Sequence, residues 1–277
     1  MKWSQIAVGN FTYYYYPFTY FLDSMEKWNI HNIELWLAEP HLCLEDCSYA
    51  GMKQFAQDIR KRNFRVCCVT PEQYQYPVNI ASSDADTRKR SINYFKKAID
   101  LAAELGAPKV LTASGHCPVG DDRKEAWKRM LEGLTELAHN ACFKGVQIVF
   151  EPMPRSIDLV KSAADVKKIL DEVGFYEGIQ AMLDFDICLR QKDMPEKYAE
   201  LLGKSNIRHI HLNDGKPGGH LIPGEGVLPV KDALEELEQM EYAEDISIEV
   251  TNPAYYEAPD AAIWKTLGFL REQTAFK

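Results

Sequence analysis

Four apolar segments in the second half of the chain each end on, or beside, a side chain that can ligate a metal ion. These residues are Glu151, Asp184, His211 and Glu249. Two glutamates, one aspartate and one histidine make a hard, oxygen-rich donor set, which suits Mn²⁺, Mg²⁺ or Co²⁺ and also accepts Zn²⁺. Each residue alone could be a capping or ion-paired group. Three carboxylates brought together would repel one another without a cation, so the set of four favours one divalent-metal site.

Two histidines stand in the third of these segments, and only one is expected to be a ligand. His209 and His211 lie two residues apart and therefore share one face of a strand. His211 is nearer to the carboxyl end, so we assign it as the ligand. His209 is expected to be a hydrogen-bonded residue one layer deeper.

The elements that must position these groups alternate along the chain. Short runs rich in Val, Ile and Leu, with little polar alternation, are typical of strands buried on both faces. These runs are residues 5–9, 32–36, 64–70, 109–113, 146–150, 179–183, 207–212 and 246–250. Apolar residues three or four apart predict helices between the runs. The clearer helices are 88–105, 121–143, 162–173, 230–240 and 258–269, and the weaker ones are 18–28, 52–62 and 194–202.

Eight strands alternating with about eight helices predict an α/β fold, a single (β/α)8 TIM barrel over residues 1–277. The alternative is a doubly wound open sheet. However, no G-x-G-x-x-G follows the first run, and G-x-x-x-x-G-K-[ST] is absent from the sequence. In a barrel the carboxyl ends of the strands meet on one rim, where active sites form. The four candidate ligands would therefore meet there.

The earlier strands deliver further side chains to the same rim. The candidates for a substrate pocket are Trp36, His41, Glu72 and His116. His116 is the strongest of them, because a polar group at the mouth could hydrogen-bond sugar hydroxyls. A structural role is about equally plausible for His41, and it is favoured for Glu34 at the end of the second strand. The aromatic residues 13–16 could wall a pocket or form a subunit interface.

Composition limits the classes of function. The 277 residues carry a formal net charge of −9, with 46% hydrophobic and 11% aromatic residues. A disordered chain is excluded, and the negative balance argues against nucleic-acid binding. We find no signal peptide and no run of about 18 apolar residues that would span a membrane. Seven scattered cysteines without a CxxC pair indicate reduced core residues and a cytoplasmic protein.

Several motifs together resemble the xylose isomerase-like family of sugar epimerases and isomerases. Within it, the similarity is greatest to the ketose 3-epimerase branch that includes fructoselysine and psicose/tagatose 3-epimerases, and it covers essentially the whole chain. The matching motifs are Ile33-Glu34-Leu35-Trp36, Pro40-His41, Thr70-Pro71-Glu72, Tyr76-Pro77, Glu151-Pro152, His209-Ile210-His211 and Ile222-Pro223-Gly224-Glu225-Gly226.

The resemblance implies a metal-binding barrel with Glu151, Asp184, His211 and Glu249 as ligands. It also implies that Glu151 and Glu249 are the catalytic acid/base pair, which moves a proton through an enediolate of a ketose or ketose derivative. The expected cofactor is one divalent ion, Mn²⁺ in first place, with Co²⁺, Mg²⁺, Zn²⁺ or Ni²⁺ as alternatives. The expected partner is a small sugar, with neither nucleic acid nor membrane, and relatives of this kind are often homo-oligomers.

Two departures from the branch leave the substrate open. Psicose/tagatose enzymes carry a substrate-contacting histidine three residues after the metal aspartate, where this chain has Ile187. They also place a substrate-contacting glutamate shortly after the Glu151 position, where this chain has Pro154-Arg155-Ser156. Arg155 is either a solvated loop residue, which is the simpler interpretation, or a contact for an anionic substrate group such as phosphate or carboxylate.

Two other activities of the same family are alternatives. An inosose-dehydratase type of lyase is the more serious. The endonuclease IV branch shares the run from His211 to Asp214, and His116 and His220 resemble two more of its zinc ligands. However, Ile187 and Gly218 stand where that branch has a further histidine and aspartate. With the net charge of −9, DNA repair is the weaker alternative.

Overall fold

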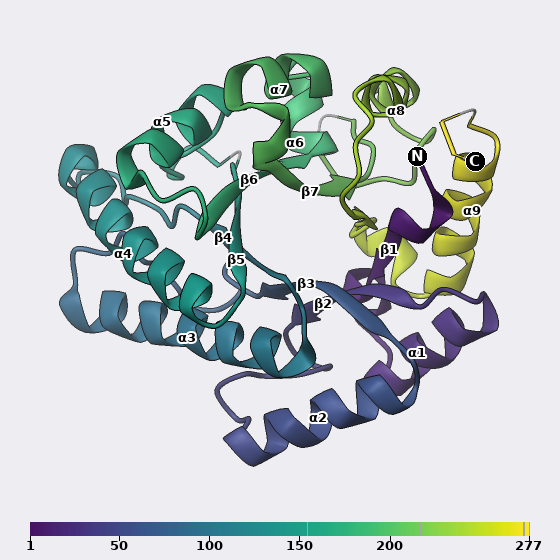
Figure 1. Cartoon of the computed structure of the whole chain (residues 1–277), viewed down its shortest axis with the longest axis horizontal. Coiled ribbons are helices and arrows are strands. Elements are labelled where there is room, and N and C mark those ends of the chain that lie inside the picture. Colours follow the sequence, from purple (N-terminus) through teal and green to yellow (C-terminus); the bar gives the residue numbers. More distant parts are fainter. Residues whose placement is uncertain (154, 217, 274, 277) are drawn as a thin grey trace.

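The protein is a closed barrel of parallel strands surrounded by helices. The computed structural model describes residues 1–153, 155–216, 218–273 and 275–276, in which eight strands pair in sequence order and the last pairs with the first. Figure 1 looks along the barrel, with the strands inside a ring of helices. The strands are β1 (Ile6–Gly9), β2 (Asn32–Leu37), β3 (Arg65–Pro71), β4 (Lys109–Ala113), β5 (Gln147–Glu151), β6 (Ile179–Asp184), β7 (Ile207–Leu212) and β8 (Ile246–Ile248). The predicted (β/α)8 fold is confirmed.

Each predicted apolar run overlaps one of these strands, and the ends differ by at most two residues. The clearest difference is β8, which ends at Ile248 although its apolar run continues to residue 250. The backbone N–H of Glu249 nevertheless donates to the carbonyl of Leu212 at 3.1 Å. The barrel therefore still holds the backbone of Glu249, although the regular strand has ended.

The predicted helices are present with shifted ends. Their bounds are α1 (Phe18–Lys27), α2 (Tyr49–Lys61), α3 (Ala85–Leu105), α4 (Arg123–Phe143), α5 (Ala163–Val173), α7 (Pro195–Leu202), α8 (Val230–Gln239) and α9 (Pro259–Arg271). The side chain of Ser162 caps α5, and Gly174 ends it in the left-handed region; both are residue types that mark helix ends in a sequence. Helix α3 begins earlier than predicted because the side chain of Asp84 accepts the backbone N–H of Thr87.

The sequence analysis missed one helix, the short α6 (Phe185–Arg190), which follows β6 without an intervening loop. Asp184 is both the last residue of β6 and the N-cap of α6, because its Oδ1 accepts the backbone N–H of Ile187 at 2.7 Å. One carboxylate therefore ends a strand and starts a helix. The missing linker explains why no boundary was visible in the sequence.

The middle of the barrel is filled by small and medium-sized apolar side chains. They form one buried cluster, which consists of Ala7, Cys67, Cys68, Leu111, Val149 and Met182. A larger core lies between the strands and the surrounding helices. The seven cysteines are free thiols, and four of them are buried, which confirms that most are core residues.

A polar cluster around the buried Asp245 lies at the end of the barrel where the strands begin. Arg65 forms two hydrogen bonds to the Asp245 carboxylate, at 2.6 and 2.9 Å, and the amide of Asn32 donates a third at 2.9 Å. Lys109 Nζ lies 3.3 Å from the same carboxylate. Burial by itself raises the pKa of Asp245, but the hydrogen bond from Arg65 and the charge of Lys109 lower it to about 2.

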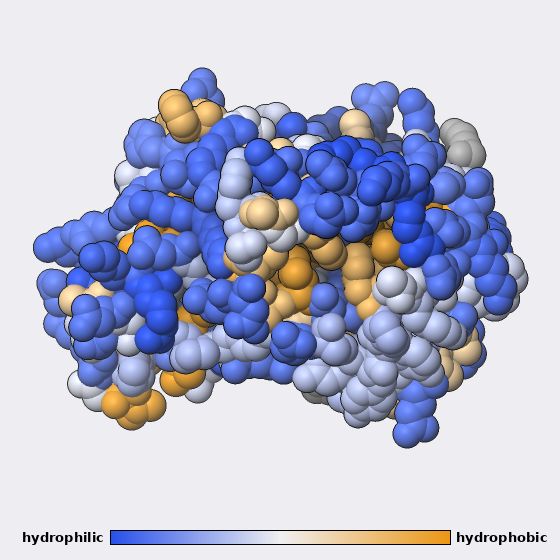
Figure 2. Space-filling model, turned by 90° about the horizontal axis from the view of Figure 1, so that it is seen from below, coloured by the Kyte–Doolittle hydropathy of each residue, from blue (hydrophilic) through white to orange (hydrophobic). Residues whose placement is uncertain are grey.

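In side view the outside of the helical ring is mainly hydrophilic, and apolar side chains show only in limited patches (Figure 2). Within the described residues, no helix has both the length and the apolar composition that a bilayer span requires.

The Asp245→Asn variant should lose stability in a pH-dependent way. The lowered pKa means that the carboxylate contributes stability above the unfolded-state pKa near 3.9, and that this contribution disappears as the pH falls from about 4 to about 2. The charge contributes about 2 kcal/mol at pH 7. Urea unfolding of both proteins at pH 7 and near pH 3 measures the difference.

The matched control is Asp58→Asn on the exposed surface of α2, where the Asp58–Lys61 ion pair is open to water. This variant should unfold like the original protein at both pH values. A stability difference for Asp245→Asn that does not change with pH would contradict the lowered pKa of Asp245 in the folded protein.

Candidate metal centre

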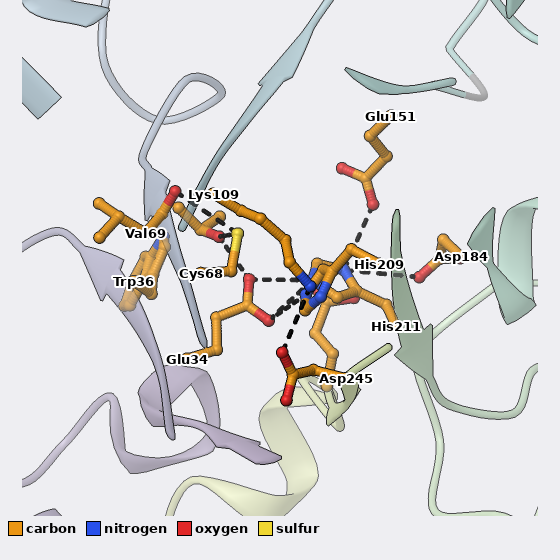
Figure 3. A network of polar contacts seen from close by, with 12 residues as sticks. Glu34, Trp36, Cys68, Val69, Lys109, Glu151, Asp184, His209, His211 and Asp245 are labelled. Carbon is orange, nitrogen blue, oxygen red and sulfur yellow. Dashed lines mark hydrogen bonds and ion pairs between the residues drawn. The ribbon is translucent and has the colours of Figure 1, made fainter. Parts of the chain in front are cut away.

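The four predicted ligands meet at the carboxyl rim of the barrel. Glu151 ends β5, Asp184 ends β6, His211 lies near the end of β7, and Glu249 follows β8. One donor atom from each lies within 4.8 Å of the others. His211 Nδ1 is 3.0 Å from Glu249 Oε2, 3.4 Å from Glu151 Oε1 and 4.0 Å from Asp184 Oδ2. Figure 3 shows Glu151 and Asp184 directed toward the His211 ring. This spacing is small enough for one cation to contact all four.

The other side of the His211 ring is fixed from beneath by Glu34. His211 Nε2 lies 3.0 and 3.1 Å from the two Glu34 oxygens, and His209 Nε2 lies 2.8 Å from Oε2. The Thr70 hydroxyl also donates to this carboxylate. Burial raises the pKa of Glu34, but the charges of the two histidines outweigh this and hold it well below the usual value. Glu34 thus leaves Nδ1 of His211 facing the carboxylates, as in carboxylate–histidine–metal triads.

The electrostatics of the rim favour a positive charge among the carboxylates. Burial raises the pKa of Asp184 to about 7, and the nearby Glu249 and Glu151 carboxylates add to the rise against the opposing effect of His220 and His211. Burial also raises the pKa of Glu151. Burial acts in the same direction on Glu249, but the charges of His211 and His220 lower its pKa. The carboxylates of this rim are therefore stabilised by nearby positive charge.

The donor set itself fits a metal ion. His211 Nδ1 is buried and, among the described residues, has no hydrogen-bond partner of acceptable geometry, although three carboxylates face it. A buried nitrogen without a partner is costly in a folded protein unless a ligand satisfies it. A divalent cation bound by His211, Glu151, Asp184 and Glu249 would satisfy it and would also neutralise the carboxylates.

Asn213 is a member of this site that the sequence analysis missed. Its Nδ2 donates to Asp184 Oδ2 at 2.7 Å and to Glu249 Oε2 at 3.3 Å, and its Oδ1 accepts the backbone N–H of Asp186. The amide therefore bridges two carboxylates that come from the strands on either side of β7. Its place two residues after His211, on the same strand face, was the available signal.

A pocket of about 350 Å³ is lined by three of the four residues, Glu151, His211 and Glu249. Its volume is within the size range of small-molecule sites. Three of the predicted pocket residues line it, namely Trp36, Glu72 and Arg155. The walls are largely aromatic and apolar, with Phe11, Trp36, Tyr74, Tyr256, Met153 and Ile187 among them. Tyr14, in the aromatic segment 13–16, supports this wall from behind, because its ring lies 5.7 Å from Trp36 and 5.3 Å from Tyr256.

Glu72 and Arg155 line the pocket but are already engaged by protein groups. Glu72 accepts Trp36 Nε1–H at 3.0 Å and the backbone N–H groups of Tyr74 and Gln75. Arg155 pairs with the buried Asp158 at 2.8 Å and lies over the Tyr74 ring at 3.8 Å. Arg155 is nevertheless exposed, as the simpler interpretation of a solvated loop residue expects, and the Asp158 charge weakens the alternative of an anion contact. Of the preceding stretch, Pro154 lies outside the described residues.

The two other predicted pocket residues do not line this pocket. His41 Nδ1 contacts Asn10 Nδ2 at 2.6 Å, and Nε2 contacts the carbonyls of Tyr13 and Tyr16 at 3.1 Å. His41 therefore holds the aromatic segment behind Trp36. His116 lines a separate, much smaller cavity together with Arg155. The sequence placed both at the rim, but the loops turn them away from the four ligands.

One residue that the sequence analysis did not expect in the pocket does line it, and it lies in a loop. His220, which the sequence analysis considered only as an endonuclease-like ligand, lines the pocket beside Glu249. Its Nδ1 lies 3.6 Å from Glu249 Oε2. The loop between β7 and α8 carries it there, so strand-end reasoning could not identify it.

Comparison with known proteins identifies the family. A family model described as xylose isomerase-like TIM barrel matches residues 22–273. The chain belongs to the xylose isomerase-like TIM barrel family. It is 30% identical over 210 residues to a fructoselysine 3-epimerase of Shigella flexneri, covering 74% of this chain and 75% of that protein. The expected family resemblance is therefore confirmed.

Two solved structures show the same fold at low identity. A D-psicose 3-epimerase from Clostridium cellulolyticum H10, solved with D-tagatose, has a TM-score of 0.78 and 18% identity, with 96% of this chain and 98% of that chain covered. An IOLI protein with a bound zinc atom has a TM-score of 0.80 and 19% identity, with 96% of each chain covered. Sugar epimerases are thus among both the sequence relatives and the fold neighbours of this family member.

The Glu34→Gln variant should bind divalent metal more weakly, by about 10- to 100-fold. A neutral amide at position 34 holds the His211 ring less firmly than the Glu34 carboxylate does. It also makes the metal-binding nitrogen of His211 a weaker base. Titration with Mn²⁺, followed by the EPR signal of the free ion, measures the affinity. Glu72→Gln is the matched control, because Glu72 lines the same pocket without contacting His211, and its Mn²⁺ affinity should be unchanged. Equal affinities for Glu34→Gln and the original protein would refute the orienting role.

Proposed function

We propose that this protein is a divalent-metal-dependent epimerase or isomerase that acts on a ketose or ketose derivative. The observation that carries the proposal is the cluster of Glu151, Asp184, His211 and Glu249, with a buried His211 nitrogen left for a ligand. Three of the four, Glu151, His211 and Glu249, line the pocket. Membership of a family with sugar epimerases supports the same class of chemistry. We further propose that the whole chain acts as one catalytic domain.

The four residues would hold one ion, with Mn²⁺ as the first choice and Co²⁺, Mg²⁺, Zn²⁺ or Ni²⁺ as alternatives. When bound, such an ion supplies Lewis-acid polarisation of the substrate carbonyl and a neighbouring hydroxyl. Other side chains of the protein orient these ligands. Glu34 fixes the His211 ring, and Asn213 fixes the Asp184 and Glu249 carboxylates.

Proton transfer is assigned to Glu151 and Glu249. They come from β5 and from the residue after β8, so they reach the pocket from different sides of the rim. One carboxylate accepts the proton from the carbon beside the carbonyl, and the C–H electron pair moves into the enediolate. The other glutamate, in its protonated form, donates its proton to the opposite face, which restores the ketone with inverted configuration. If the proton is instead removed from C1 of the ketose, its return to C2 gives an aldose.

The pocket supports a substrate larger than a free hexose. Its volume of about 350 Å³ and its aromatic wall, including Trp36, Tyr74 and Tyr256, leave apolar surface beyond the four ligands. A ketose with an attached chain would use that surface. Fructoselysine is the derivative to test first, because the 30% identical relative is named fructoselysine 3-epimerase.

Two other reactions are outcomes to be tested. An inosose dehydratase would begin with the same proton removal, so the ligand set alone does not separate it from an epimerase. An endonuclease would need the further ligands that Ile187 and Gly218 replace, and a chain of net charge −9 is poorly suited to a phosphate backbone. The seven free thiols support placement of the enzyme in the reducing cytoplasm.

The deciding experiment is proton exchange in D₂O. Mn²⁺-loaded protein is incubated with fructoselysine, D-fructose, D-psicose and ketose phosphates, and the products are followed by NMR. Deuterium beside the carbonyl together with an epimer or aldose is the expected result. Metal binding without exchange in any ketose would overturn the proposal, and inososes and abasic DNA would then be tested for dehydration and cleavage.

Glu249→Gln should reduce turnover by about 10²- to 10⁴-fold, because the amide cannot accept or return the proton. The variant should keep its fold, since the amide has nearly the same shape. Initial rates of exchange and of epimer formation, with circular dichroism as the folding check, measure the effect. Near-normal activity would refute the acid/base assignment.

Removal of the metal should abolish exchange, and one equivalent of Mn²⁺ should restore it. The expected cause is loss of carbonyl polarisation together with renewed repulsion among the carboxylates. His211→Ala should lower the bound metal below one per chain in elemental analysis. Unchanged metal content in this variant would refute the ligand role of His211.

A further inference from the structure

His220 reaches the pocket through an unusual backbone path. It lies in the loop between β7 and α8 and has a φ of 40°, a left-handed value that is uncommon for a residue other than glycine. The preceding Gly218 and Gly219 have φ values of 85° and 110°. Such conformations are often stored at functional sites, where surrounding structure holds them. This backbone brings the imidazole against the ligand Glu249.

The backbone of the loop is held mainly by the Asp214 side chain. Asp214, which is buried, accepts the backbone N–H groups of Gly224, Gly226 and Leu228 through its two carboxylate oxygens. Asp214 also pairs with Leu221 through two backbone hydrogen bonds, at 2.6 and 2.8 Å. The fold of the loop is therefore accounted for by Asp214. The His220 side chain itself contacts residues outside this loop, namely Thr251, Asp186 and Glu249.

The His220 ring lies between a carboxylate and the pocket. On one side, Nε2 is 3.7 Å from Asp186 Oδ2, which is an ion-pair distance but too long for a hydrogen bond. On the other side, Nδ1 is 2.9 Å from the Thr251 hydroxyl and 3.6 Å from Glu249 Oε2. Thr251, Glu249 and His220 all line the pocket, whereas Asp186 lies behind the ring. The ring nitrogen Nδ1 is therefore the one on the pocket side, where a substrate would bind.

We propose that His220 is a further catalytic residue, whose Nδ1 hydrogen-bonds the substrate oxygen that lies beside Glu249. The inference rests on the proposed function and specifies which residue of the chain contacts that oxygen. The Asp186 carboxylate, near Nε2, orients the ring from the side away from the pocket. The Thr251 hydroxyl lies beside Nδ1 and also lines the pocket.

The physical reason is the charge that develops during proton removal. Negative charge moves onto the substrate oxygens, and the neighbouring Glu249 carboxylate would oppose it. A preorganised hydrogen-bond donor at this point stabilises the transition state more than the ground state. Ile187, another residue that lines the pocket, is apolar and cannot supply such a contact.

The test compares His220→Ala with His220→Gln and with the control His139→Ala. His139 lies on the exposed face of α4, stacked on Phe175, so its removal leaves the pocket unchanged. With Mn²⁺-loaded protein and fructoselysine, kcat and KM are measured from solvent deuterium exchange. Bound metal and the unfolding midpoint are measured for each variant.

We expect kcat of His220→Ala to fall by about 10²-fold or more, as for the loss of one donor to a developing oxyanion. Metal content and unfolding midpoint should be unchanged, and His220→Gln should retain more activity than His220→Ala. Added imidazole should restore part of the activity of His220→Ala and have no effect on His139→Ala. A merely structural role would not respond to imidazole.

The outcomes separate this inference from the proposed function. An active original protein with an equally active His220→Ala variant would overturn the inference alone. So would a His220→Ala variant that loses its metal, because His220 would then support the metal site rather than contact substrate. An original protein that exchanges no proton in any ketose of the panel overturns the proposed function, and the inference fails with it.

Discussion

The repulsion among three buried carboxylates is the constraint around which the rim of this barrel is built. Glu151, Asp184 and Glu249 come from strands 33 to 98 positions apart in the chain, and closure of the barrel brings them within 4.8 Å of one another. In a site shielded from water such a group is costly unless a positive charge and hydrogen bonds offset it. His211 and Asn213 supply the contacts that the protein itself provides. A cation would supply the rest.

The support for this group extends downward through the barrel in layers. Glu34 lies beneath His211 and joins it to His209, so that two imidazoles share one fully buried carboxylate. Below this layer the interior is apolar, and at the far end Asp245 is surrounded by cations and an amide. Buried charges are therefore paired at both ends, while the middle is held by packing. This arrangement lets the rim carry unfavourable charge on a rigid scaffold.

Much of the fold was predictable because its signals are local. The strands buried on both faces gave apolar runs, and Ser162 and Gly174 marked the ends of a helix. Helix α6 was missed because Asp184 ends a strand and caps a helix with the same carboxylate, which removes the linker that would mark the boundary. His41 and His116 follow the ends of β2 and β4 along the chain, as the sequence analysis assumed. Their loops nevertheless direct them to other partners, and loop direction has no comparable local signal.

The sequence by itself determined the alternation of strands and helices and the residue type at each strand end. These follow from hydrophobic periodicity and from the two-residue period of a strand, which are properties of neighbours along the chain. Only the tertiary structure decided that Glu34 orients His211, that Asn213 bridges two carboxylates and that His220 enters the pocket. Those contacts join residues 29 to 177 positions apart, or depend on a left-handed loop backbone. They are fixed by barrel closure and by loop packing, which no local pattern encodes.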